Sequence, residues 1–171
     1  MENYVKTLLY AYPSLDRMKD TYAHHIRTSA VLSCDGRMDT EKLTEYLLKE
    51  ILHKRRLEWL KVTLDRVLNR LNDLERALIE SAFFRKKGIL KVILHKYSKA
   101  KCKKKNISER SCRRFLNRTL EKIKALLSTY GVNKQSFEEE LLPMEMIGKI
   151  YRWVCFHSDK TQSGTSYSSI S

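Results

Sequence analysis

The stretch LEWLKVTLDRVLNRLNDLERAL, residues 57–78, decides the fold class of this chain. Its apolar residues step alternately by three and four positions: Leu57, Leu60, Leu64, Val67, Leu71, Leu74 and Leu78. This is the heptad spacing of helices that pack along one seam. The seam predicts either an intramolecular bundle or a dimeric coiled coil, and three heptads do not decide between them. We favour the bundle, because short seams usually close within one domain.

Two capping signals divide the helical pattern. Asn72 and Glu75 have the spacing of a capping box, which predicts that a helix breaks there and restarts. Ser136 and Glu139 repeat that spacing ahead of a second apolar-periodic stretch. Pro143 is expected to kink or restart that last helix. The sequence therefore predicts several helices in succession.

The composition is typical of a helical protein. Only two Pro and five Gly occur among 171 residues, so few positions interrupt a helix. Ser14 follows Pro13 and is predicted to cap a helix that runs to about residue 32. The chain is long enough to bury a core without a metal or disulfides. We predict an all-α fold, a helical bundle.

Net charge is concentrated in one window, residues 85–124. This window holds sixteen Lys or Arg and two acids, Glu109 and Glu121, which gives a net charge of +14. The other 131 residues hold eighteen bases and eighteen acids and sum to zero. A field of one sign on one surface attracts polyanions, since neutralised phosphates release condensed counterions. Nucleic acid is therefore the expected partner.

The first part of this window, residues 85–105, contains ten Lys or Arg and no acid. The apolar residues within it predict a short buried helix: Ile89, Leu90, Val92, Ile93 and Leu94. The polar run that follows, residues 99–105, is expected to form a loop that lies along phosphates. Its predicted contacts with a nucleic-acid backbone are Lys101, Lys103, Lys104 and Lys105. The other interpretation is a solvated loop without a partner.

The second part of the window predicts an amphipathic helix that begins after Ser108, whose hydroxyl is suited to cap it. Helical spacing gives its inward face: Cys112, Phe115 or Leu116, Thr119, Leu120, Ile123 and Leu127. Its outward face near the N-terminal end carries Glu109, Arg110, Arg113, Arg114 and Asn117. In the major groove, Arg can bind guanine and Asn can bind adenine through paired hydrogen bonds. Spacing alone leaves two interpretations open, a DNA-reading helix and an ordinary amphipathic helix with a basic face.

The sequence ISERSCRRFLNRTLEKIK, residues 107–124, resembles the recognition helix of sigma factor region four. The matching positions are Ser108, Ser111, Arg114, Leu116, Leu120, Lys122 and Ile123. Upstream, LNDLERALI, residues 71–79, is similar to the Leu-x-x-x-Glu-Arg helix that opens the same domain. The chain departs from the pattern at Cys112, where the family usually has Val, and at Thr119, where it usually has Ala.

The resemblance implies a helix-turn-helix in the C-terminal half of the chain, with double-stranded DNA as the partner. Under it, the base-reading residues are Arg110, Arg113, Arg114 and Asn117. The residues that contact the DNA backbone are Lys101, Lys103, Lys104, Lys105, Ser108 and Arg118. Residues 1–70 do not resemble the promoter-melting region two. We therefore expect a transcriptional regulator like the sigma-like proteins of Gram-positive bacteria and their phages, with RNA polymerase as a second implied partner.

The predicted organisation has four ranges along the chain. They are an N-terminal helical region at 1–70, the DNA-binding domain at 71–130, a C-terminal packing helix at 131–157 and a flexible tail at 158–171. The N-terminal helices are expected to brace the domain, to form a homodimer through the Leu57–Leu78 seam, or to contact RNA polymerase.

Other classes of function have less support in the sequence. The four cysteines are scattered, and the Cys155–His157 and His24–His25 pairs lack further ligands, so no metal or other cofactor is expected. The sequence has no phosphate-binding glycine loop, no Ser, His and Asp in the order of a catalytic triad, and no paired-carboxylate motif. We therefore do not expect an enzyme. No apolar stretch approaches the roughly 18 to 20 residues of a bilayer span, and the N-terminus lacks a signal-peptide pattern. A cytoplasmic protein without a membrane partner is predicted.

The alternative function is non-specific nucleic-acid or RNA binding through the lysine run, beside a helical protein-interaction bundle. Tyr97 and Phe115 are the only Phe, Tyr or Trp residues in the basic window. Proteins that hold single strands stack successive bases on aromatic side chains. The window therefore does not indicate a stacking platform of that kind.

Overall fold

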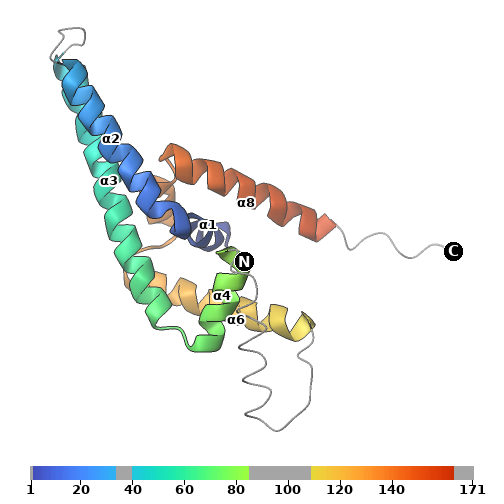
Figure 1. Cartoon of the computed structure of the whole chain (residues 1–171). Helices are drawn as coiled ribbons and strands as arrows, with labels where there is room; N and C mark the ends of the chain where they lie inside the picture. The colour runs from blue at the N-terminus through green and yellow to red at the C-terminus, as the bar shows by residue number, and fades with distance from the viewer. Residues whose placement is uncertain (1, 34–39, 85–108, 164–171) are drawn as a thin grey trace.

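The computed structural model describes residues 2–33, 40–84 and 109–163, and every regular element in these ranges is a helix (Figure 1). The elements are α1 (Asn3–Ala11), η1 (Tyr12–Ser14), α2 (Leu15–Ser33), α3 (Thr40–Asn69), α4 (Asp73–Phe83), α6 (Glu109–Thr129), α7 (Lys134–Ser136), η2 (Phe137–Leu141) and α8 (Glu145–Ser163). Of these, η1 is a 3-10 turn and η2 is a π-helical turn. The predicted all-α fold is confirmed for the described residues. None of their helices is long and apolar enough to cross a bilayer.

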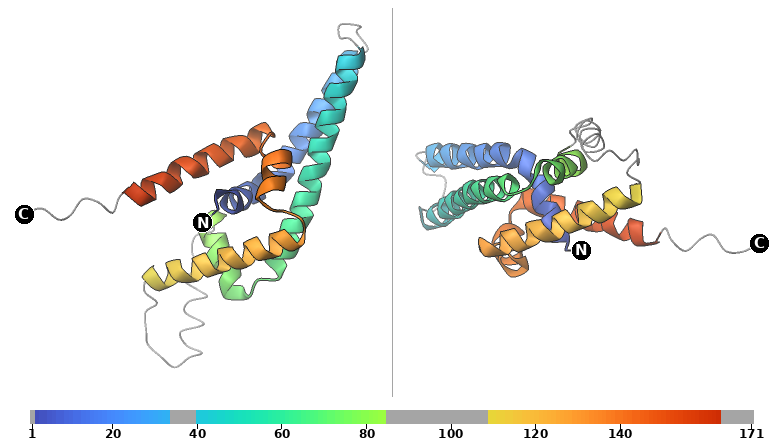
Figure 2. Two further views of the ribbon diagram at one scale, coloured as in Figure 1. Left: turned by 180° about the vertical axis from the view of Figure 1, so that it is seen from behind. Right: turned by 90° about the horizontal axis from the view of Figure 1, so that it is seen from below.

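The longest feature is the antiparallel pair of α2 and α3, which extends beyond the other helices (Figure 1, Figure 2). The 30 residues of α3 lie in two different environments. Near the tip of the pair, Leu48 and Leu52 are largely exposed. Toward the other end, Leu57, Leu60 and Leu64 are almost completely buried. Only the second half of α3 therefore contributes to the main core.

The apolar seam of residues 57–78 is divided between two helices, as the capping signal predicts. Asn72 caps α4: its side chain accepts from the N–H of Glu75, and the Glu75 carboxylate accepts from the N–H of Asn72, each at 2.9 Å. Most of the seam residues are buried within the chain: Leu57, Leu60, Leu64, Val67, Leu71 and Leu78. The seam is thus the intramolecular bundle, and these side chains are not available for a coiled-coil dimer.

One hydrophobic core draws on all three of the predicted helical ranges. Its members include Leu8, Leu60, Leu64, Ile79, Ile123, Leu127, Phe137 and Ile147, all at most 1% exposed. Burying a side chain of this size contributes roughly 1.5 to 3 kcal/mol relative to leaving it in water. The ranges 1–70, 71–130 and 131–157 are therefore packed on one another around a shared core.

Ser14 does not cap α2 in the predicted way. Its hydroxyl donates to the carbonyl oxygen of Ala11 at 2.8 Å. A capping residue has extended backbone angles and accepts a hydrogen bond from the helix that follows. Here the backbone stays helical through η1, and the N–H of Leu15 donates to the carbonyl oxygen of Tyr12. The first N–H of α2 thus has a backbone acceptor and does not need the serine.

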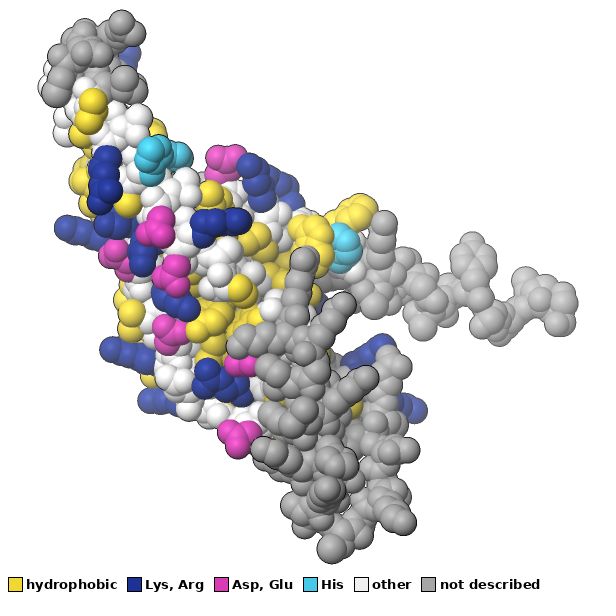
Figure 3. Space-filling view, viewed as in Figure 1, with side chains coloured by type: hydrophobic (Ala, Val, Ile, Leu, Met, Phe, Trp, Pro, Cys, Tyr) yellow, Lys and Arg dark blue, Asp and Glu magenta, His cyan; other side chains and the backbone are white. Residues whose placement is uncertain are grey.

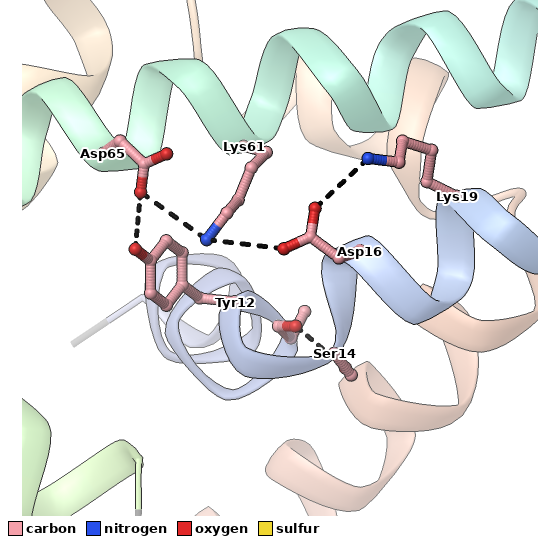
Figure 4. Close-up of polar contacts among 7 residues, drawn as sticks. Tyr12, Ser14, Asp16, Lys19, Lys61 and Asp65 are labelled. Carbon is pink, nitrogen blue, oxygen red and sulfur yellow. Dashed lines mark hydrogen bonds and ion pairs between the residues drawn. The ribbon is translucent and has the colours of Figure 1, made fainter.

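A polar network holds this junction against α3 (Figure 4). The Tyr12 hydroxyl donates to Oδ1 of Asp65 at 2.5 Å, and Nζ of Lys61 lies 3.8 Å from the centroid of the Tyr12 ring. Lys61 is also 3.6 Å from Asp65 and 3.9 Å from Asp16. Burial raises the pKa of Tyr12, and the hydrogen bond to Asp65 raises it further. Burial opposes the charge of Lys61, but Tyr12 and the two carboxylates outweigh it and raise the Lys61 pKa.

The second predicted capping box is displaced by one turn. Asn133, not Ser136, is the N-cap: its side chain accepts from the N–H of Ser136 at 2.9 Å. The Ser136 hydroxyl in turn accepts from the N–H of Asn133 at 2.9 Å. Ser136 is therefore the third helical residue, and Glu139 lies in η2. The restart expected at Pro143 is confirmed, since α8 begins at Glu145.

Candidate nucleic-acid interface

The C-terminal half of α6 is fixed in the core. Leu120, Ile123 and Leu127 are at most 2% exposed and lie one turn apart on the face that meets α1, α3 and α4. Thr119 is also buried, and its hydroxyl donates to the carbonyl oxygen of Phe115 at 3.0 Å. The inward face predicted from helical spacing is confirmed from Thr119 onward, whereas Cys112, Phe115 and Leu116 are half-buried. This packing determines the rotation of α6 about its own axis.

Two ion pairs add to this anchoring. Nζ of Lys122 lies 2.7 Å from Oε2 of Glu75 on α4, and Nζ of Lys124 lies 2.9 Å from Oε1 of Glu2 before α1. Two of the sixteen basic residues in the 85–124 window are thus neutralised by acids from elsewhere in the chain. Both lie in the C-terminal half of α6. Neither belongs to the predicted set of DNA-contacting residues.

The N-terminal half of α6 presents a basic stripe, defined by five exposed residues: Arg110, Arg113, Arg114, Asn117 and Arg118. They lie at i, i+3, i+4, i+7 and i+8, so at about 100° per residue they cover an arc of roughly 140°. That arc is opposite the side that carries Thr119 and Ile123. In Figure 1 and Figure 2 this end of α6, drawn in yellow, extends beyond α4. The C-terminal half of α6 is therefore packed in the core, while its N-terminal half is exposed to solvent.

The electrostatics of the basic stripe favour an anionic partner. No Asp or Glu occurs from residue 110 to residue 118. Arg110, Arg114 and Arg118 make no ion pair with any other residue in the described part of the chain. Their charge is not compensated by the described protein surface, which leaves it available to phosphates or base edges.

The structure brings together five of the ten predicted site residues. Arg110, Arg113, Arg114, Asn117 and Arg118 share one face of α6. The other five lie outside the described residues: Lys101, Lys103, Lys104, Lys105 and Ser108. The first described residue of α6 is Glu109, directly after Ser108.

The two helices that carry the family resemblance, α4 and α6, are in contact with each other. Residues 85–108 between them are outside the described ranges. The helix-turn-helix therefore stays a prediction.

The described residues offer no site for a metal ion. No three His, Cys, Asp or Glu side chains among them lie together in a way that could hold one. Cys112 and Cys155 are free thiols, both half-buried, and Sγ of Cys155 accepts from Nδ2 of Asn3 at 3.4 Å. His25 lies 3.3 Å from Glu50, an ion-pair geometry between α2 and α3.

Sequence patterns missed two features of the surface. One is the use of Glu75 as the acceptor for Lys122, 47 positions away. The other is a groove between α1, α2, α4 and α8 whose lining includes several aromatic side chains. Each joins segments that are distant in sequence, which local spacing does not reveal.

Comparison of the chain with models of protein families, with curated proteins and with solved structures gives no significant match.

Proposed function

We propose that this protein is a sequence-specific, double-stranded DNA-binding regulator of transcription, and that α6 is its recognition helix. The observation that carries the proposal is the basic stripe. It is exposed, contains no acid and lies at one end of a helix whose other end is fixed by buried Leu120, Ile123 and Leu127. A recognition helix needs this division, because side chains can report the base sequence only when the backbone behind them has a fixed position.

The dimensions of the stripe suit the major groove. The stripe runs from Arg110 to Arg118, which is about 12 Å along the helix axis at 1.5 Å per residue, and the groove is about 12 Å wide. Arg110, Arg113, Arg114 and Asn117 are assigned to base edges and neighbouring phosphates. Arg118 lies farthest from the N-terminal end and is assigned to the DNA backbone. The predicted backbone contacts of Lys101, Lys103, Lys104 and Lys105, and the cap at Ser108, complete this assignment.

The rest of the chain has a supporting role in this proposal. Helix α4 takes the place of the helix that opens sigma region four, and α6 takes the place of its recognition helix. The pair of α2 and α3 extends away from α6 and is proposed to contact RNA polymerase or another regulatory partner (Figure 1). The activity is proposed for the cytoplasm, without a catalytic step.

The test is the selection of bound duplexes from a random DNA pool at about 0.15 M salt, near physiological ionic strength. The expected result is a consensus sequence that Arg114→Ala erases. Lys134→Ala is the matched control, because Lys134 is an exposed base on another helix, with 66% of its side chain accessible. A pool without enrichment, bound with an affinity that only falls as salt rises, would instead identify the non-specific or RNA-binding alternative.

A further inference from the structure

A groove of about 540 Å³ lies where α8 passes the junction of α1 and α2 and the end of α4. Residues of α1, η1, α2, α4 and α8 contribute to it, with Tyr10, Arg17, Phe83 and Trp153 among the lining residues. Figure 3 shows hydrophobic side chains gathered over this part of the molecule, with Lys and Arg side chains beside them. The groove shares no residue with the basic stripe of α6.

Four of the described residues that line the groove are aromatic: Tyr10, Phe83, Phe84 and Trp153. The Tyr10 ring meets Phe83 at a centroid distance of 4.8 Å and Trp153 at 5.0 Å, both edge to face. Trp153 is nevertheless 45% exposed, although a tryptophan usually buries most of its surface in a core. Phe156, one turn farther along α8, is 58% exposed. Two large rings on one side of α8 are thus left in contact with water, which is typical of an interaction surface.

The charge around the groove has one sign. Among the described residues, Arg17 and Lys149 line it and no Asp or Glu does. Lys149 pairs with Glu145, one turn earlier on α8, at 2.5 Å. Arg17 makes no ion pair with any residue that the structure describes. An occupant that carries carboxylates therefore gains an interaction that the described chain does not provide.

We propose that this groove docks an acidic amphipathic segment of a partner protein. A bulky apolar side chain of that segment, Leu, Phe or Trp, inserts against Tyr10, Phe83 and Trp153. An Asp or Glu one turn away from it reaches Arg17. Buried aromatic and arginine side chains supply most of the binding energy in interfaces of this kind.

Nucleic acid fits this groove less well than a peptide does. The Tyr10 and Trp153 rings meet edge to face, and one face of Trp153 packs on His157 at a centroid distance of 4.3 Å. This arrangement does not favour the stacking of a base on Trp153. The Ser14 hydroxyl in the lining already donates to Ala11. Arg17 and Lys149 supply only donors, so the N–H groups of a base would find few acceptors in the described lining, which is costly for buried groups. The strongly basic residues 85–105 of the chain itself carry the same charge as Arg17 and Lys149, so they are disfavoured as an internal occupant.

The test is the selection of peptides from a random library displayed on phage, with the full-length protein as bait. Enriched peptides are expected to combine one bulky apolar residue with at least two acids. A synthetic copy of an enriched peptide is then titrated, and the emission of Trp153 is followed in a Trp59→Phe background, since the chain has two tryptophans. Trp153→Ala, followed by anisotropy of a labelled peptide, and Arg17→Glu are each expected to weaken binding about tenfold or more.

Two control variants test whether the loss of peptide affinity is specific to the groove. Trp59 on α3 is 46% exposed and lies outside the groove, so Trp59→Ala should leave the affinity unchanged. Arg114→Ala should also leave it unchanged, which separates this proposal from the proposed DNA binding. The proposal is overturned if no peptide is enriched, if enriched peptides bind the two groove variants as well as they bind the wild type, or if they lack acids. It is also overturned if a single-stranded oligonucleotide displaces the peptide.

Discussion

Oε2 of Glu75 accepts two hydrogen bonds at once, from Nζ of Lys122 at 2.7 Å and from the N–H of Asn72 at 2.9 Å. The first joins α4 to α6, and the second completes the cap of α4. The Glu75 side chain is 13% exposed, whereas the Lys122 side chain is 42% exposed. A single acid thus contacts both the start of α4 and the C-terminal half of the proposed recognition helix. Because it lies under α6 and not on the basic stripe, its role is to position that helix.

Glu75→Ala is expected to lower the free energy of unfolding by about 1 to 2 kcal/mol, from the lost cap and the lost ion pair. A double-mutant cycle with Lys122→Ala should give a coupling of about 0.5 to 1 kcal/mol, measured by urea unfolding. The control cycle uses Glu145 and Lys149, whose side chains are 77% and 65% exposed. Its coupling should be smaller, at roughly 0.3 kcal/mol. Equal couplings would show that Glu75 does not fix α6.

Arg114→Ala and Arg118→Ala should affect DNA binding in different ways. Arg114→Ala is expected to cost about 1 to 3 kcal/mol on a selected duplex and much less on a random one. Arg118→Ala should weaken both duplexes alike and reduce the slope of log K against log salt by about 1. Fluorescence anisotropy titrations at several salt concentrations measure both quantities. Equal losses on both duplexes for Arg114→Ala would remove its assignment to a base.

Local periodicity was sufficient to predict that the described residues are helical and which side of α6 faces the core. The inward face of α6 and the cap at Asn72 both follow from 3.6-residue spacing and from the chemistry of one helical turn. Ser136 shows where such spacing is ambiguous, because Asn133, Ser136 and Glu139 are each three positions apart. Ser136 and Glu139 fit the usual capping box, whereas Asn133 and Ser136 have the same spacing with a serine in place of the usual Glu or Gln. The backbone angles of Asn133, which are extended, decide between them.

Contacts between distant segments could not be predicted in this way. The Glu75–Lys122 pair depends on how α4 crosses α6, and the groove depends on α8 returning past Tyr10 and Phe83. Helix crossings follow from how many side chains interdigitate at once, which no local pattern specifies. The same limit applies to the site. The residues of the basic stripe and their shared helix face could be predicted from residues 110–118. The ion pairs of Lys122 and Lys124 with acids elsewhere in the chain could not be predicted.

The displaced capping box gives a direct comparison of two single substitutions. Asn133→Ala removes the side chain that accepts from the N–H of Ser136, so it is expected to cost about 1 kcal/mol of unfolding free energy. Glu139→Ala removes only an exposed hydrogen bond from Gln135 and should change stability by less than about 0.5 kcal/mol. Urea midpoints at constant m-value measure both. A larger loss of unfolding free energy for Glu139→Ala than for Asn133→Ala would instead identify Ser136 as the N-cap.

His53 makes the pairing of α2 with α3 sensitive to acid. Its ring lies 5.4 Å from that of Tyr22 on α2, and its Nδ1 is buried without a hydrogen-bond partner among the described residues. Burial lowers the pKa of His53 below its ordinary value of 6.5, Lys49 and Arg56 lower it too, and Glu50 opposes them. The folded state therefore prefers the neutral ring. The associated stability is fully present above pH 6.5 and is lost as the pH falls through the folded-state pKa.

The urea midpoint of the wild-type protein should accordingly fall as the pH is lowered from 7.5 to 5. His53→Phe keeps an aromatic ring against Tyr22 but does not titrate, so its midpoint should fall less over the same interval. His24→Gln is the control, because His24 lies on the exposed side of α2 and its replacement should leave the wild-type slope in place. If His53→Phe kept the full wild-type slope, the acid sensitivity would have to come from groups other than the His53 ring between α2 and α3.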